Sequence, residues 1–190
     1  MSSRAAILLA LGVWFALALI LGAAGGFADF SAAGIALTVW GLTIVLLLAW
    51  WRSETVRRGV DALSLPALVA IHLCRFVGIY FLILGSRGAL PTAFAFPAGI
   101  GDIIVAVGAV LALLTPRFHA SRSFIVAWNL IGMVDIVAVV FNALRCGLRD
   151  WQSMAALREL PLSLLPAFVV PLIIASHVWI FVRLFRRRVG

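Results

Sequence analysis

The sequence lacks lysine altogether and has few charged residues of any kind. Only 12% of its 190 residues are charged: seven are acidic, and all fifteen cationic residues are arginine. A soluble domain carries about a quarter of charged residues, so this composition excludes a soluble cytosolic enzyme. Polar tracts are also missing, and the 16 glycines and 7 prolines follow no fixed period. Disordered and collagen-like chains are therefore excluded as well.

Cysteine is scarce too, with only Cys74 and Cys146 present. Cys74 falls inside an apolar run and Cys146 just beyond the end of another, so their expected depths in a membrane differ too much for a disulfide. The sequence has no CxxC, HxxE or HExxH motif, and His119 stands apart from the other two histidines. We therefore expect neither a disulfide-exchange enzyme nor a metal site.

What the chain does contain is apolar residues, which make up 65% of it and give a mean hydropathy of +1.19. A helix needs roughly 20 apolar residues to cross about 30 Å of hydrocarbon. None of the apolar runs alternates as the strands of a membrane barrel would. The pattern predicts an all-α integral membrane bundle, one domain over residues 1–190, with six transmembrane helices at about 5–28, 30–51, 65–86, 91–115, 123–145 and 160–184.

The arginines near the span ends predict the orientation of the bundle. Ten fall on the side of the two termini and four on the other side. By the positive-inside rule, both termini are expected in the cytoplasm, as in a multi-pass protein of the bacterial inner (plasma) membrane. The formal charge of +8 is then a topological signal, and no nucleic-acid partner is expected. We also considered a cleaved signal peptide at the first span, but its apolar run is long for one.

Three charged residues lie deep inside the predicted spans, away from their ends: Arg75, Asp102 and Asp135. Arg75 and Asp135 come out near the bilayer midplane, and Asp102 does so if its span begins near Pro91 rather than Pro97. An ionised side chain in hydrocarbon costs several kcal/mol unless it pairs or faces a polar interior. We expect the three to neutralise one another, either as a site that takes up protons reversibly or only as a link between helices.

A second polar layer is expected from His72, Asn129 and His177, which all fall roughly 10 Å from the cytoplasmic boundary. Two histidines at one depth raise the alternative of a b-haem with His72 and His177 as axial ligands. The simpler alternative is that each histidine is hydrogen-bonded and packed. No catalytic residues are predicted: the serines lie far from the deep histidines, and Arg75 would keep both aspartates ionised, unlike an aspartyl protease dyad.

These features favour a small carrier that binds a small anionic solute at Arg75 and couples it to protonation of Asp102 or Asp135. Glycines and prolines inside the spans would let backbone groups line a substrate site. The alternatives are haem-based electron transfer and a non-catalytic accessory subunit, or homo-oligomer, that docks in a membrane complex. Besides the lipid bilayer itself, anionic lipid headgroups are expected partners of the tail residues Arg186, Arg187 and Arg188.

Two segments of this sequence resemble segments of other proteins. They are FPAGIGD at residues 96–102 and WNLIGMVD at residues 128–135, followed in the last span by Pro171 and His177. They resemble a group of small uncharacterised bacterial multi-span membrane proteins with PAGxGD and WNxxGxxD segments. No known activity is attached to that group, so the resemblance implies a multi-span fold and supports the choice of residues without implying a substrate.

Overall fold

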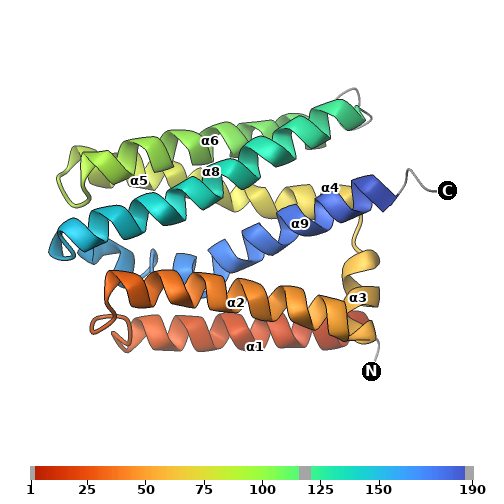
Figure 1. The fold of residues 1–190 in the computed structure, drawn as a ribbon, viewed down its shortest axis with the longest axis horizontal. Coiled ribbons are helices and arrows are strands. Elements are labelled where there is room, and N and C mark those ends of the chain that lie inside the picture. The colour runs from red at the N-terminus through yellow and green to blue at the C-terminus, as the bar shows by residue number, and fades with distance from the viewer. Residues whose placement is uncertain (1–2, 116–120, 187–190) are drawn as a thin grey trace.

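The computed structural model describes residues 3–115 and 121–186, and these residues form helices and turns with no strand. Six helical segments are long and apolar enough to cross a membrane. They run along one common direction, as Figure 1 shows. The predicted all-α architecture with six membrane-spanning helices is therefore confirmed, and the chain is a multi-pass membrane protein.

The helices follow the predicted runs closely. Four of the spans contain one regular helix each, the third span is built from three short helical segments in series, and the last begins with a π-helical turn. In chain order the elements are α1 (Ser3–Ala23), α2 (Ala32–Arg52), α3 (Glu54–Asp61), α4 (Leu65–Ala70), η1 (Ile71–Phe76), α5 (Val77–Ser86), α6 (Thr92–Leu114), α8 (Arg122–Arg149), η2 (Gln152–Arg158), η3 (Leu165–Val169) and α9 (Val170–Arg186).

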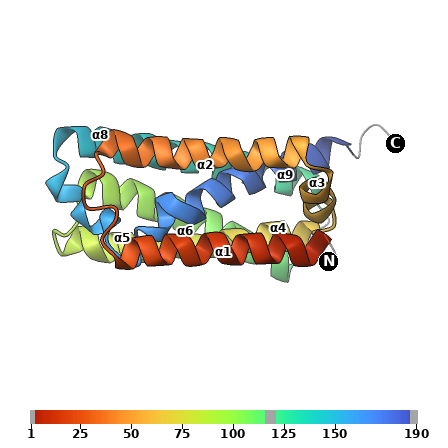
Figure 2. The same cartoon turned by 90° about the horizontal axis from the view of Figure 1, so that it is seen from below.

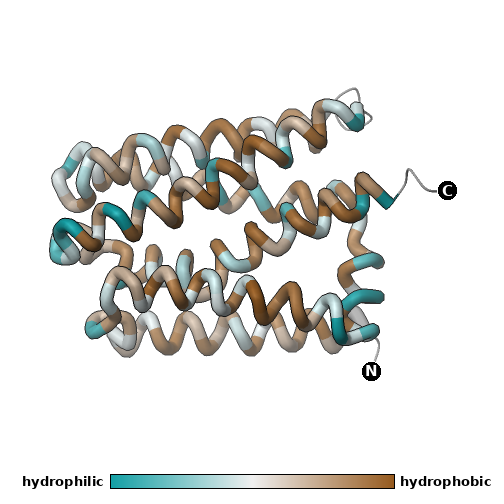
Figure 3. The backbone as a smooth tube through the Cα atoms, in the orientation of Figure 1, coloured by the Kyte–Doolittle hydropathy of each residue, from teal (hydrophilic) through white to brown (hydrophobic). Residues whose placement is uncertain are grey.

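The bundle has two distinct ends. We call the end with both chain termini and α3 the terminal end, and the end with the turns at 24–31 and 87–91 and with η2 the loop end (Figure 1). Figure 2 shows α3 lying across the terminal end, where it bridges α1 and α2. Hydrophilic residues gather at the two ends and apolar residues cover the length between them (Figure 3). This distribution fits a bundle whose middle faces hydrocarbon.

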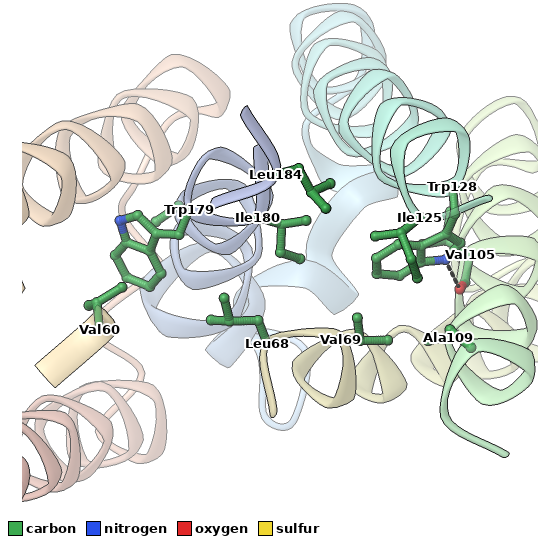
Figure 4. Packing of buried hydrophobic residues seen from close by; sticks show 12 residues of the cluster. Val60, Leu68, Val69, Val105, Ala109, Ile125, Trp128, Trp179, Ile180 and Leu184 are labelled. Carbon is green, nitrogen blue, oxygen red and sulfur yellow. Dashed lines mark hydrogen bonds between the residues drawn. The ribbon is translucent and has the colours of Figure 1, made fainter. Parts of the chain in front are cut away.

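Helix α9 lies in the middle of the bundle and α1 at its edge. Of the residues in the most apolar stretch of the last span, 61% are buried inside the bundle. The corresponding share for α1 is 11%. At the terminal end, α9 packs into a buried apolar cluster with α4, α6 and α8. Figure 4 shows this cluster, in which the Trp128 indole N–H donates to the carbonyl oxygen of Val105 at 2.9 Å and Trp179 lies against Val60.

The start of the fourth span is settled by the structure. Pro91 is the N-cap residue of α6, and Pro97 lies within the helix. A proline inside a helix has no N–H for the carbonyl four residues earlier, here that of Ala93. The side-chain amide of Asn142 on α8 donates to this oxygen at 2.9 Å. Asp102 consequently lies eleven residues into a 23-residue helix, at the central depth that the Pro91 alternative predicts.

The last span begins later than predicted. Its helical part starts at Leu165 rather than at residue 160, because the preceding segment folds inward. In that segment Asp150 accepts hydrogen bonds from the backbone N–H groups of Gln152 and Ser153 and so caps η2. Met154 and Leu157 are buried in the apolar cluster of the loop end, so this segment closes the bundle there.

Candidate functional site

Arg75 is the centre of the polar interior and is fully buried. Its Nε–H donates to Asp102 Oδ1 at 2.7 Å, and its Nη1 donates to the carbonyl oxygen of Gly132 at 3.0 Å. Its Nη2 forms a hydrogen-bonded ion pair with Asp135 Oδ2. The structure thus brings the charged residues of the third, fourth and fifth spans into one group, which we call the ion cluster (Arg75, Asp102 and Asp135).

Glycines allow the helices to approach closely enough for these contacts. A Cβ on Gly78 of α5 would overlap the carbonyl oxygen of Gly99 on α6, and a Cβ on Gly101 would overlap the carboxylate of Asp135. The backbones of α5 and α6 therefore meet at a glycine pair, and Asp135 lies over a gap on α6. Each glycine falls within three residues of a charged member of the cluster. Their positions in the sequence could therefore have indicated where these helices approach each other.

The ion cluster has more negative than positive charge. One guanidinium faces two carboxylates, so the fully ionised cluster has a surplus of one negative charge. The side chain of Asp102 is 5% exposed and that of Asp135 is 19% exposed. In the described part of the chain, the other arginines lie near the ends of the bundle, outside this polar interior. An uncompensated charge at this depth is unfavourable unless it binds a proton or another cation.

His72, Asn129 and His177 form a second group next to the cluster, on the side of the terminal end, and all three are fully buried. Asn129 donates through Nδ2 to the carbonyl oxygen of His177 at 3.0 Å, so its Oδ1, 2.8 Å from His177 Nδ1, must accept the imidazole proton. Ser176 Oγ donates to the carbonyl oxygen of Ile173 at 2.8 Å and therefore accepts from His72 Nε2 at 3.1 Å. The network thus assigns a tautomer to each histidine.

Each histidine is left with one basic nitrogen. His72 Nδ1 and His177 Nε2 are buried and have no hydrogen-bond partner among the described residues. The two rings are in contact, with centroids 4.2 Å apart. Gly132 joins this layer to the cluster, because its carbonyl oxygen accepts from Arg75 and a Cβ on it would lie 2.5 Å from His177 Cε1. Sequence reasoning missed Ser176 and the Gly132 carbonyl oxygen, since only the fold shows which small residues face the polar groups.

The histidine pair does not fit the haem alternative as the rings lie. Axial ligation places the porphyrin between the two imidazoles. Rings with centroids 4.2 Å apart are already in van der Waals contact and leave no space for a macrocycle between them. No group of three or more histidine, cysteine or acidic residues in the described ranges is arranged to hold a metal ion.

A cavity of about 80 Å³ lies on the other side of the cluster, toward the loop end. Arg75 and Asp102 are the charged residues that line it, and the rest of its lining is almost entirely apolar, contributed by α2, α5, α6, α8, η2 and the start of the last span. Cys74 also lines it, next to Arg75. The ion cluster therefore lies between a cavity on the side of the loop end and a packed histidine layer on the side of the terminal end.

The tail arginines are only partly described. Arg186 lies 3.8 Å from Asp61 and over the ring of Trp50 at 5.8 Å from its centroid. Arg187 and Arg188, also expected to contact anionic lipid headgroups, lie outside the described residues.

Comparison with known proteins shows a family that covers most of the chain. A model of the domain of unknown function DUF8737 matches residues 32–185, which include α2 and every residue of the ion cluster and histidine layer. Helix α1 lies outside the matched range. Searches of curated proteins and of solved structures gave no significant match.

Proposed function

We propose that this chain, which belongs to the DUF8737 family, is a small proton-coupled membrane carrier in which the ion cluster is the proton-binding centre. The observation that carries the proposal is the surplus carboxylate: Asp102 and Asp135 share one guanidinium in the middle of a membrane bundle. One bound proton makes the cluster neutral, and loss of that proton restores a negative charge that favours binding of a cation.

The two sides of the cluster offer different surroundings to a proton. The cavity adjoins Asp102 on the side of the loop end. Toward the terminal end, the Gly132 backbone and the two open imidazole nitrogens of His72 and His177 follow Arg75. The histidine layer also closes the bundle on this side, so a transport cycle must loosen it.

The contacts of Arg75 bear on the charge of the solute. The sequence favours an anionic solute at this arginine, but its three hydrogen bonds hold it to two carboxylates and a carbonyl oxygen. An anion bound here would increase the surplus negative charge. In the proposal, Arg75 is therefore the fixed counter-charge, and the carboxylates are the groups that change state. The proposed location is the bacterial inner membrane with both termini in the cytoplasm, because most arginines near the span ends lie on the side of the termini.

Infrared difference spectra of the purified protein between acidic and neutral buffer test the proton site. We expect a protonated-carboxyl band that appears on acidification and disappears in both Asp135→Asn and Asp102→Asn, because each substitution leaves one carboxylate paired with Arg75. Asp150→Asn is the matched control, because this exposed aspartate caps η2 with an oxygen that asparagine retains. If the wild type shows no pH-dependent carboxyl band that these two substitutions alter, the cluster is a permanent structural link and the proposal is wrong.

Proteoliposomes with an entrapped pH-sensitive dye test the carrier. Citrate, glutamate, glucose and tetramethylammonium are added in turn, and the internal pH is followed. We expect one of these solute classes to change the internal pH with the wild type and Asp150→Asn but not with Asp135→Asn. If no solute has an effect with a monodisperse protein that shows the carboxyl band, the carrier proposal fails and an accessory subunit becomes the better account.

A further inference from the structure

The cavity beside the ion cluster has the dimensions of a site for a small molecule. It follows α8 from Ile136 to Leu144, eight residues or about 12 Å along the helix axis. Its volume of about 80 Å³ corresponds to roughly five to eight water-sized spheres at about 10–15 Å³ each. A ligand of about that many non-hydrogen atoms therefore fits without rearrangement.

The lining favours an apolar ligand body. Phe81 and Phe94, from α5 and α6, line the cavity and contact each other edge to face, with centroids 5.4 Å apart. Aromatic faces attract organic cations as well as apolar groups. Water would find few hydrogen-bonding partners on such a surface, and neither would a strongly hydrated solute.

The charges at the inner end of the cavity favour a cation. Arg75 and Asp102, one charge of each sign, line this end, and Asp135 is paired with Arg75 outside the lining, so the ionised cluster as a whole places a surplus of one negative charge near the cavity. A monovalent cation would neutralise it, whereas an anion would double it. An inorganic cation needs several oxygen ligands, and no suitable group of three or more acidic, histidine or cysteine residues occurs in the described ranges.

We propose that this cavity binds a compact apolar monocation of the alkylammonium or quaternary ammonium class, with its positive charge toward the ion cluster. The cation replaces the proton: as it enters, one proton leaves the carboxyl group for water, and the cluster stays neutral in both states. This inference rests on the proposed proton site and names the substrate class of that site.

Isothermal titration calorimetry with three probes of similar size and different charge tests the inference. The probes are tetramethylammonium, the neutral tert-butanol and the anionic pivalate. We expect saturable binding of tetramethylammonium at least about tenfold tighter than that of the other two. In buffers of different ionisation enthalpy, about one proton should be released per cation bound when the cluster is protonated. Equal binding of all three probes, or no binding of any, would overturn the inference.

Two pairs of variants separate the effect of the cluster's net charge on binding from the effect of the space in the cavity. Asp135 does not line the cavity. If only direct contact mattered, Asp135→Asn would leave tetramethylammonium binding unchanged, whereas the net charge of the cluster predicts that this variant loses about tenfold or more in affinity. Asp150→Asn is the control. Ala36→Phe fills the wall of the cavity on α2, and Ala33→Phe adds the same ring at an exposed position of this helix. We expect only Ala36→Phe to abolish binding.

Cys74 offers a second readout because it lies in the cavity wall. In a Cys146→Ala background, tetramethylammonium should slow the reaction of Cys74 with N-ethylmaleimide several-fold, whereas pivalate should not. A Cys74→Ala variant gives the background reaction. Absence of tetramethylammonium binding in a protein that still shows the pH-dependent carboxyl band would refute the cavity inference alone. Absence of the band would refute the proton site on which it rests.

Discussion

Replacing Arg75 by methionine leaves two carboxylates facing each other in the middle of the bundle without a cation. The side chain of Arg75 makes three hydrogen bonds, to Asp102, Asp135 and the Gly132 carbonyl oxygen. Removing one partner of a buried ion pair costs about 3–5 kcal/mol, because the other charge remains buried and unpaired. We expect Arg75→Met to lower the free energy of unfolding by about this amount.

Replacing either aspartate alone should lower the free energy of unfolding far less. Asp102→Asn leaves a neutral pair of Arg75 and Asp135, and the asparagine oxygen can still accept the N–H that Asp102 accepts at 2.7 Å. The ion-pair hydrogen bond is then weakened to one between a guanidinium and a neutral amide oxygen, a loss of about 1 kcal/mol. The same reasoning applies to Asp135→Asn.

The double variant Asp102→Asn/Asp135→Asn again leaves an unpaired buried charge, now that of Arg75. It should cost about 3–5 kcal/mol, so the two substitutions are non-additive by about 1–3 kcal/mol. Titration with SDS in mixed micelles, followed by tryptophan fluorescence, measures these free energies. Single aspartate variants as unstable as Arg75→Met, or a double variant equal to the sum of the singles, would refute the idea of a surplus carboxylate.

Three further predictions follow from other parts of the fold. Gly132→Ala should lower the free energy of unfolding in the same SDS titration by about 1–3 kcal/mol, because the new Cβ would lie 2.5 Å from His177 Cε1. Gly41→Ala, with nothing within 4 Å, should leave it unchanged or raise it by up to about 1 kcal/mol. A hydrogen bond from Arg58 and its charge lower the pKa of the exposed Glu54 below its ordinary 4.5, so this ion pair adds stability above that pH and loses it as the pH falls through the folded-state pKa. In Arg58→Gln, carboxyl NMR should show the Glu54 pKa rising toward 4.5, and an unchanged value would contradict this cause. Finally, fusions at both chain ends in a bacterial host should give fluorescence from green fluorescent protein and no alkaline phosphatase activity, and the reverse result would refute the predicted orientation.

Much of the fold could be predicted because a membrane helix must satisfy its own backbone hydrogen bonds. Apolar length alone then locates the spans, and all six appear in the structure within a few residues of their expected bounds. The largest deviations are five residues each: the first span ends at Ala23 rather than at 28, and the last begins at Leu165 rather than at 160. The later start of the last span arises where the chain folds inward at the loop end. There the packing of buried residues such as Met154 decides the path.

The sequence by itself determined the depth of most of the polar residues, because position along a helix converts to depth at 1.5 Å per residue. It thereby placed Arg75 and Asp135 at one level and His72, Asn129 and His177 at another, whereas the depth of Asp102 depended on the choice between Pro91 and Pro97 that the structure made. Only the tertiary structure decided which of these side chains meet and at what distance, since rotation about each helix axis and the spacing between axes depend on packing across the whole bundle. That packing brought the two imidazoles into contact, left a cavity on one side of the ion cluster, and let glycines on α5 and α6 bring the charges together.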